Sequence, residues 1–317
     1  MSARALAADP LPALDAEKAY TVSGVSSGAY MAVQFHVAHS AVVKGAGAIA
    51  GGPYYCAQGS AWAAYYHCRA PGWFTPLPAN ALLRAQAEAL AAAGRIDATA
   101  NLSGARVWLF SGTEDATVER AVVDAALAFY ADYEANAVLV GDKPAGHGMV
   151  TEDAGNACPV SAAPYINDCD YDAAGELLMH LYGKLSVPSL AGKLLRFDQT
   201  PFGGRDISMG DEGFVFIPQA CEAERCRVHV AFHGCRQTVD DIGERFVREA
   251  GYNRWAGANR LIVLYPQAIR RFWGTYNPRG CWDWWGYTGP RYHTKEAGQI
   301  RAVKAMLDRL SAPRPAR

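Results

Sequence analysis

Short apolar runs of strand length alternate with longer stretches of helical periodicity along the chain. Apolar runs of about four to eight residues are typical of buried strands, and apolar residues spaced three and four apart are typical of amphipathic helices. The predicted strands cover residues 19–22, 42–50, 105–110, 137–140, 213–218, 228–232 and 261–265. The predicted helices cover residues 29–39, 79–93, 118–133, 171–183, 243–258 and 294–310. This alternation predicts an α/β fold with a mainly parallel central sheet flanked by helices.

Three segments lack this periodicity. Residues 53–77 are rich in aromatic side chains, residues 150–170 are polar, and residues 272–293 are dense in Trp, Tyr and Gly. No repeat, low-complexity linker or change of composition divides the chain. We therefore expect one domain over residues 1–317, with residues 1–15 and 312–317 frayed.

The overall charge argues against polyanionic partners. The net charge of the 317 residues is −1, and no long run of one sign occurs. Nucleic acids and anionic membrane surfaces attract strongly basic patches, so neither is an expected partner. The longest apolar stretches, such as residues 42–52, are shorter than the roughly 18 residues of a membrane span. We expect a monomer.

Eight cysteines indicate the redox environment of the protein. Three close pairs leave a fourth, more distant one, and the expected disulfides are Cys56–Cys68, Cys158–Cys169, Cys221–Cys226 and Cys235–Cys281. An even count with local pairing favours disulfides formed in an oxidising compartment, although about 105 pairings are formally possible. The spacings do not match those of a metal site, so no metal is expected.

The first twenty residues contain no apolar segment of signal-peptide type. The triplet Ala5-Leu6-Ala7 nevertheless resembles the end of a cleavage site. Our hypothesis is that the chain is the mature form of an extracellular or periplasmic protein.

The most informative motif is Gly24-Val25-Ser26-Ser27-Gly28, between a predicted strand and a predicted helix. Strand, Gly-x-Ser-x-Gly and helix together are the context of a nucleophile elbow, a sharp turn that exposes a serine hydroxyl. The motif alone also fits a Gly/Ser turn without chemistry. Ser26 is thus a candidate nucleophile if the chain also supplies a base and an acid.

Two later loops supply these partners in the order that an α/β-hydrolase requires. Asp115 follows the strand 105–110 after a Gly turn, and we prefer it to Glu114 as the acid. Its alternative role is to cap the helix that follows. His147 lies between two glycines after the strand 137–140, where it has little reason to serve packing. We therefore predict a Ser26–Asp115–His147 triad.

An oxyanion hole needs two backbone N–H groups, one of which belongs to the residue after the nucleophile, here Ser27. The other comes from a loop of the type His233-Gly234-Cys235, which follows the strand 228–232. In an ordinary α/β-hydrolase this loop precedes the elbow. Here it comes 234 − 26 = 208 residues later. The simplest explanation is a circularly permuted α/β-hydrolase, and the alternative is a turn with no such role.

Taken together, these motifs resemble a known family, the extracellular poly(3-hydroxybutyrate) depolymerases of the single-domain, circularly permuted type. The resemblance covers about residues 20–290 and rests on Gly24 to Met31, Ser111 to Asp115, Gly146-His147, His233-Gly234-Cys235 and Asn277 to Tyr287. It implies a cofactor-free serine esterase that cuts polyhydroxyalkanoate ester bonds in polymer or oligomer. It also places the nucleophile on Ser26, the acid on Asp115, the base on His147 and the oxyanion amides on Ser27 and Cys235.

Multi-domain members of that family carry a separate polymer-binding domain, and we expect none here. Any contact with solid polymer must then come from the surface of the catalytic domain. We predict that Trp284 or Trp285 lines an ester-binding crevice, with Tyr30 as a weaker candidate. The alternative for all three is a place in the core.

Two other functions stay open at this point. A feruloyl or acetylxylan esterase would share the triad and would use the aromatic loop to stack on a phenolic group or a sugar. A binding module without catalysis is disfavoured, because Ser26, Asp115 and His147 all follow strands in the expected order.

Overall fold

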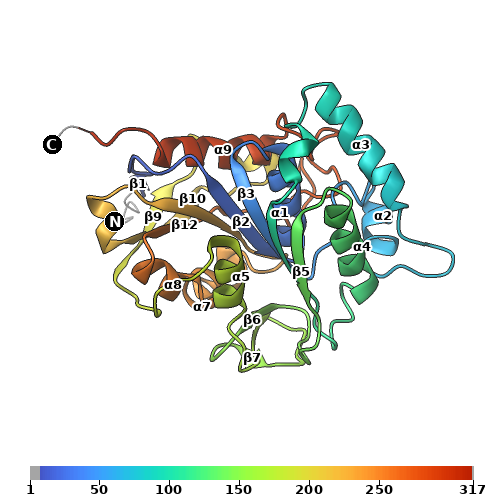
Figure 1. Ribbon diagram of the computed structural model, residues 1–317, viewed down its shortest axis with the longest axis horizontal. Helices are drawn as coiled ribbons and strands as arrows, with labels where there is room; N and C mark the ends of the chain where they lie inside the picture. The colour runs from blue at the N-terminus through green and yellow to red at the C-terminus, as the bar shows by residue number, and fades with distance from the viewer. Residues whose placement is uncertain (1–7, 316–317) are drawn as a thin grey trace.

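The computed structural model describes residues 8–315, and a twisted central sheet runs through its middle (Figure 1). The spatial order of the strands is β1-β9-β10-β12-β11-β2-β3-β4-β5. All neighbours from β12 to β5 are parallel, whereas β10 is antiparallel to both β9 and β12. Their bounds are β1 Asp9–Pro10, β2 Tyr20–Val25, β3 Val43–Ile49, β4 Arg106–Phe110, β5 Asn136–Val140, β9 Gly192–Asp198, β10 Glu212–Pro218, β11 Arg227–Phe232 and β12 Leu261–Tyr265.

Helices cover both faces of this sheet (Figure 1). One hydrophobic core lies under α1, α3, α4 and α9, and a second lies under α5, α7 and α8 on the opposite face. Every residue of the central strand β2 is buried, as expected for a parallel strand covered on both sides. The helices are α1 Ser27–Ala38, α2 Ala61–Tyr66, α3 Asn80–Ala92, α4 Arg120–Ala131, α5 Ala173–Tyr182, α6 Val239–Ile242, α7 Arg245–Glu249, α8 Tyr252–Ala258 and α9 Gly298–Leu310. The predicted α/β fold is confirmed.

The segment predicted as a polar loop over residues 150–170 contains a second, small sheet. Its strands are β6 Met149–Thr151, β7 Asn156–Ala157 and β8 Ile166–Asp168, in the order β6-β8-β7. These strands have two or three residues each, too few to produce an alternating pattern that sequence reasoning can detect.

Three further elements differ from the sequence-based expectation. Strand β9 was not predicted, because its mixed residues lie toward the edge of the sheet and are only partly buried. Helix α2 lies within the segment 53–77 that was expected to be a loop. The helix predicted over residues 243–258 is interrupted at Gly251, whose φ of +88° ends the helical conformation between α7 and α8.

The prediction that residues 1–15 and 312–317 are frayed is wrong for the part of them that the structure describes. The N–H groups of Leu14 and Asp15 donate to the carbonyls of Leu310 and Ala312. Leu11 is also 1% exposed, so this segment belongs to the core. Residues 1–7 and 316–317 lie outside the described residues. The two described ends of the chain are therefore packed against each other.

All eight cysteines form disulfides. The pairs are Cys56–Cys68, Cys158–Cys169, Cys221–Cys226 and Cys235–Cys281. This is the pairing expected from the sequence. In the described part of the chain, the helices are all too short or too polar to span a bilayer.

Five of the six buried histidines, all except His147, have lowered pKa values and stay neutral. Burial lowers the pKa from 6.5 to about 3 for His36 and His229, and to about 4 for His39, His233 and His293. The imidazole ring of His229 is hydrogen-bonded at both nitrogens: Nδ1 lies 2.6 Å from the hydroxyl of Thr21, and Nε2 lies 2.7 Å from the hydroxyl of Ser23. Protonating such a ring inside the protein is unfavourable, while the unfolded chain takes up the proton near its ordinary pKa.

We predict that the free energy of unfolding falls as the pH is lowered from about 6.5 to about 4. In this range the unfolded chain binds more protons than the folded one, so stability rises with pH. Each buried histidine contributes up to about 1.4 kcal/mol per pH unit. Urea unfolding between pH 7 and pH 4.5 measures the slope. His39→Gln should reduce it, and a profile that is flat over this range would contradict the prediction.

Candidate active site

Ser26 occupies a strained turn between β2 and α1. Its φ is +56° and its ψ is −122°, a backbone conformation that non-glycine residues rarely adopt. A Cβ at Gly24 would lie 2.3 Å from the carbonyl carbon of Gly28, and a Cβ at Gly28 would lie 2.4 Å from the carbonyl oxygen of Phe232. Neither position accepts a side chain. This is the strand–turn–helix geometry of a nucleophile elbow.

Asp115 and His147 meet at the carboxyl ends of the adjacent strands β4 and β5. The Nδ1 of His147 lies 2.8 Å from Oδ2 of Asp115, and both side chains are buried. The other carboxylate oxygen of Asp115 accepts the N–H groups of Thr117 and Val118 at 2.8 and 3.0 Å. Helix α4 begins at Arg120 with Glu119 at its N-cap, so Asp115 holds the turn before the helix and does not cap the helix itself. Its contact with His147 fits the predicted role of the acid. The carboxylate orients the imidazole so that Nδ1 donates and Nε2 is the acceptor nitrogen of the neutral ring.

The disulfide-closed segment 158–169 packs around His147. The backbone N–H of His147 donates to Oγ of Ser161 at 2.7 Å, and the N–H of Gly146 donates to the carbonyl of Cys158 at 2.8 Å. The ring of Tyr165 lies edge-on to the imidazole, with 6.5 Å between centroids. The position of the histidine thus depends on this segment as well as on β5.

The loop after β11 lies directly against the elbow. A Cβ at Gly234 would be 3.3 Å from the Cβ of Ser26. His233 fixes this loop, because its Nε2 accepts the N–H of Ala268 at 3.1 Å and its Nδ1 donates to the carbonyl of Gly234 at 2.7 Å. Burial keeps the pKa of His233 near 4, so the neutral tautomer that makes both bonds persists at neutral pH.

Two backbone N–H groups beside Ser26 are free to bind a ligand. Ser27 is the first residue of α1, so its N–H has no acceptor within the helix. The N–H of Cys235 has no acceptor among residues 8–315. The two loops are held together, because Oγ of Ser27 accepts the N–H of Trp282 at 3.3 Å and Cys235 is bonded to Cys281.

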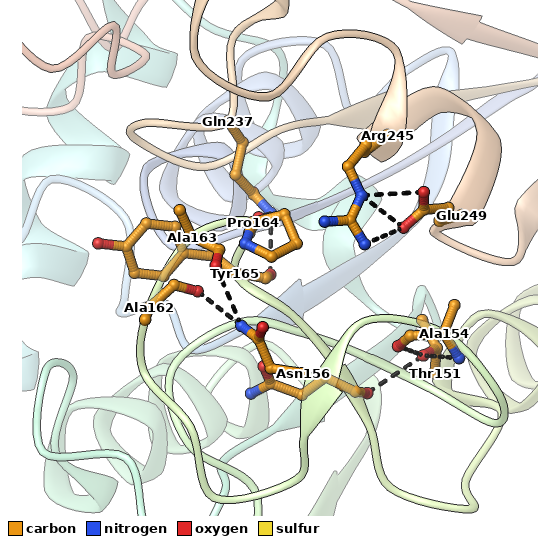
Figure 2. A network of polar contacts seen from close by, with 11 residues as sticks. Thr151, Ala154, Asn156, Ala162, Ala163, Pro164, Tyr165, Gln237, Arg245 and Glu249 are labelled. Carbon is orange, nitrogen blue, oxygen red and sulfur yellow. Dashed lines mark hydrogen bonds and ion pairs between the residues drawn. The ribbon is translucent and has the colours of Figure 1, made fainter.

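Gln237 connects this loop to the segment that holds the histidine. Its Oε1 accepts the N–H of Gly234 at 2.7 Å. Its Nε2 donates to the carbonyls of Pro164 and Tyr165 at 3.1 and 2.9 Å (Figure 2). The side chain is 2% exposed and uses both ends of its amide. Sequence reasoning missed it, because a glutamine after a turn carries no signal of such a distant contact.

The aromatic residues proposed to contact substrate lie at different depths. Tyr30 is 3% exposed and stacks on Trp284, with 3.9 Å between ring centroids and 10° between planes. Its hydroxyl donates to the carbonyl of Cys68. This burial argues against the prediction that Tyr30 contacts substrate and supports the core alternative. Trp285 is more accessible and packs across the edge of Trp284 and against Tyr287.

A buried carboxylate shapes the aromatic loop. Asp283 is 1% exposed and accepts the backbone N–H groups of Trp285, Gly286, Tyr287 and Thr288, at 2.7 to 3.2 Å. Burial raises the pKa of this carboxyl, and the hydrogen bonds oppose the rise. The loop therefore turns around a single side chain that sequence reasoning did not select.

The order of strands shows how the site is assembled from distant parts of the chain. Strand β11 comes about 200 residues after β2, yet the two are adjacent and parallel, with Phe232 opposite Gly24. Moving the chain ends to a point before the elbow produces this order from that of an ordinary α/β-hydrolase. The fold and the site together define a circularly permuted α/β-hydrolase.

Comparison with known proteins identifies the family. A scan against models of protein families finds no match. The chain is 44% identical over 317 residues to a poly(3-hydroxybutyrate) depolymerase of Delftia acidovorans, covering 96% of this chain and 62% of the relative. It is 36% identical over 330 residues to a polyhydroxybutyrate depolymerase of Talaromyces funiculosus, covering 98% of this chain and 95% of the relative. The chain belongs to the polyhydroxybutyrate depolymerase family.

Two solved structures agree with this assignment. The crystal structure of a PHB depolymerase from Penicillium funiculosum matches with a TM-score of 0.85 and 33% identity. A serine-to-alanine variant of a PHB depolymerase, complexed with an R3HB trimer, matches equally well. In each case the alignment covers 95% of this chain and 98% of the other.

Proposed function

We propose that the protein is a serine esterase that hydrolyses the ester bonds of poly(3-hydroxybutyrate) or its oligomers. The observation that carries the proposal is the 2.8 Å hydrogen bond between Asp115 and His147 at the strand ends beside the elbow of Ser26. The relatives named as depolymerases of this polyester supply the substrate class. These relatives favour the polyester as the substrate over a feruloyl or acetylxylan ester.

The triad performs acyl transfer in two stages. In the first, Oγ of Ser26 attacks the ester carbonyl while Nε2 of His147 accepts the serine proton. His147 then gives this proton to the oxygen of the leaving alcohol, and the acyl group stays on Ser26. Asp115 stabilises the imidazolium that forms between these steps.

The second stage returns the enzyme to its starting state. Water attacks the acyl-enzyme, His147 accepts the water proton and passes it to Oγ of Ser26, and the acid leaves. The N–H groups of Ser27 and Cys235 stabilise the oxyanion of each tetrahedral intermediate. A Cβ on Gly234 would lie 3.3 Å from the Cβ of Ser26, so the absence of a side chain lets the loop that carries Cys235 pack against Ser26. The mechanism uses only groups of this chain.

The compartment and the domain organisation belong to the same proposal. Four disulfides favour an extracellular or periplasmic location, because thiols stay reduced in the cytosol. We assign residues 8–315 to one catalytic domain, since β1, β9 and the described C-terminal residues share its sheet and its cores.

An exposed apolar tip provides a contact for solid polyester. Trp73 and Phe74 are each 92% exposed, in the turn between Gly72 and Thr75. The loop that follows α2 extends away from the rest of the molecule at the right of Figure 1. Large apolar side chains with this exposure usually mark an interaction site. An uncharged, methyl-bearing polyester matches their chemistry.

Ser26→Ala should lower the rate of ester hydrolysis by at least about 10³-fold, because no other group can carry the acyl intermediate. Release of 3-hydroxybutyrate from a soluble trimer measures the rate, with ferulate release from a feruloyl ester as the test of the alternative. Ser103→Ala, at an exposed position, serves as the matched control. Unchanged hydrolysis by Ser26→Ala would refute the mechanism.

Gln237→Ala should lower kcat by about tenfold to a hundredfold and leave KM nearly unchanged. The substitution leaves the N–H of Gly234 without its acceptor and frees the loop of Cys235, so the oxyanion donor is less well placed. The exposed Gln219→Ala is the control. A rise in KM at constant kcat would show that Gln237 acts on binding instead.

Replacing both Trp73 and Phe74 with Ala should reduce adsorption to a poly(3-hydroxybutyrate) film severalfold, because apolar contact area is lost. The clearing rate of a polymer suspension should fall with it, while the kcat/KM for the soluble trimer stays the same. Replacing the exposed Val187 and Leu190 with Ala is the matched control. Equal adsorption of the double variant and the parent protein would exclude the contact.

A further inference from the structure

Two exposed arginines lie on the loops that surround the oxyanion donor. Arg236 follows Cys235 directly, and Arg279 precedes Cys281 by two residues. The N–H of Arg236 donates to the carbonyl of Arg279 at 2.7 Å, and the Cys235–Cys281 disulfide joins the two loops. The covalent bond and the hydrogen bond together fix these backbones at one edge of the site.

Neither arginine forms an ion pair within residues 8–315, whereas eleven other arginines in this range do. The neighbouring Arg270, for example, is paired with Asp241. The net charge of the chain is −1, so the protein as a whole carries no excess of positive charge. A ligand carboxylate is the natural partner of a guanidinium group, because guanidinium and carboxylate form paired, charge-assisted hydrogen bonds.

The side chain of Arg236 lies near the segment that supports His147. Its Nη1 lies 3.4 Å from the hydroxyl of Tyr165, and the ring of Tyr165 packs edge-on against His147. In the proposed mechanism His147 gives its proton to the leaving oxygen. Departure of the alcohol on the His147 side of the site would bring its far end toward Tyr165 and Arg236.

The chemistry of the substrate then identifies the ligand. When the last ester bond of an oligoester is cut, the leaving alcohol is a hydroxy acid whose other end is a free carboxylate. Interior bonds of a long polymer place another neutral ester at the same position. A cation on the leaving side therefore distinguishes the acid end of a chain from its interior.

We propose that Arg236, assisted by Arg279, binds the terminal carboxylate of soluble 3-hydroxyalkanoate oligomers and directs cleavage to the bonds nearest that end. This inference rests on the proposed function. In the reaction the acyl C–O bond breaks, the Ser26 ester forms, and the serine proton passes through His147 to the leaving oxygen. The released hydroxy acid keeps the carboxylate that Arg236 binds.

The test compares the 3-hydroxybutyrate trimer as its free acid with the methyl ester of the same trimer. The two differ at the terminal group, a carboxylate in one and a neutral methyl ester in the other. The ratio of their kcat/KM values for cleavage of the two internal ester bonds, with methanol release measured separately, therefore reports recognition of the carboxylate. The unmodified protein should favour the free acid by about three- to tenfold at low ionic strength. Salt at 0.5 M or above should reduce this preference, because the pair is exposed to solvent.

Arg236→Gln should bring the ratio close to one and remove its dependence on salt. Arg236→Lys should keep only part of the preference. The positive charge remains, but the planar guanidinium that can make two parallel hydrogen bonds to a carboxylate is lost. Arg279→Gln should have a smaller effect in the same direction. Arg225→Gln is the matched control, because Arg225 is exposed and precedes β11, at the opposite end of the strand from the site.

Equal kcat/KM values for the two trimers, or the same ratio in Arg236→Gln as in the parent protein, would overturn the inference while leaving the esterase intact. Failure of the proposed function has another signature, since neither trimer would then be hydrolysed. A preference that Arg225→Gln also removes would point to long-range electrostatics and would likewise refute a role for Arg236.

Discussion

The close contact between the first turn of α1, at the elbow, and the end of β11 is the constraint on which the rest of the site depends. Gly28 lies so close to the carbonyls of Phe232 and His233 that any Cβ would clash with them. This contact places the loop of Gly234 against Ser26. Because the residues involved are about 200 positions apart, the nucleophile and its oxyanion loop come together only when the parallel sheet has formed. The strained backbone of Ser26 is maintained by that sheet and not by local sequence.

Polar side chains with saturated hydrogen bonding then fix the loops around the elbow. His233 hydrogen-bonds the loop of Gly234 to Ala268, and Gln237 hydrogen-bonds the same loop to the segment that supports His147. Asp283 organises the aromatic loop in the same manner. Each of these groups is buried, and each would be costly to leave without partners. The geometry around Ser26 and His147 is therefore supported by buried groups that are neutral or fully hydrogen-bonded.

The sequence predicted the parts of this structure that leave a local pattern. The parallel strands and the disulfide pairs follow from apolar runs and cysteine positions, and glycine spacing leads to the prediction of the triad. The sequence did not predict β9, whose mixed residues near the sheet edge have no clear period, or the packing of Leu11 and Leu14, which depends on the far end of the chain. Gln237 and Asp283 act through contacts that only the fold creates. For Tyr30 the sequence left the crevice and the core open, because an aromatic residue beside a nucleophile suits both, and its burial favours the core.

The distribution of charge separates two tasks that a polyester hydrolase has to perform. Chemistry on a neutral ester needs dipoles at the carbonyl, and in the proposed mechanism the helix N-terminus at Ser27 and the amide of Cys235 supply them. Locating the end of a chain needs a charge, because the terminal carboxylate is the one ionised group of a polyhydroxyalkanoate at neutral pH. Arg236 is exposed and follows Cys235 directly, so the proposed carboxylate contact lies at the rim of the site. The bias that it introduces grows as the chain shortens, since each cut raises the proportion of bonds close to an acid end.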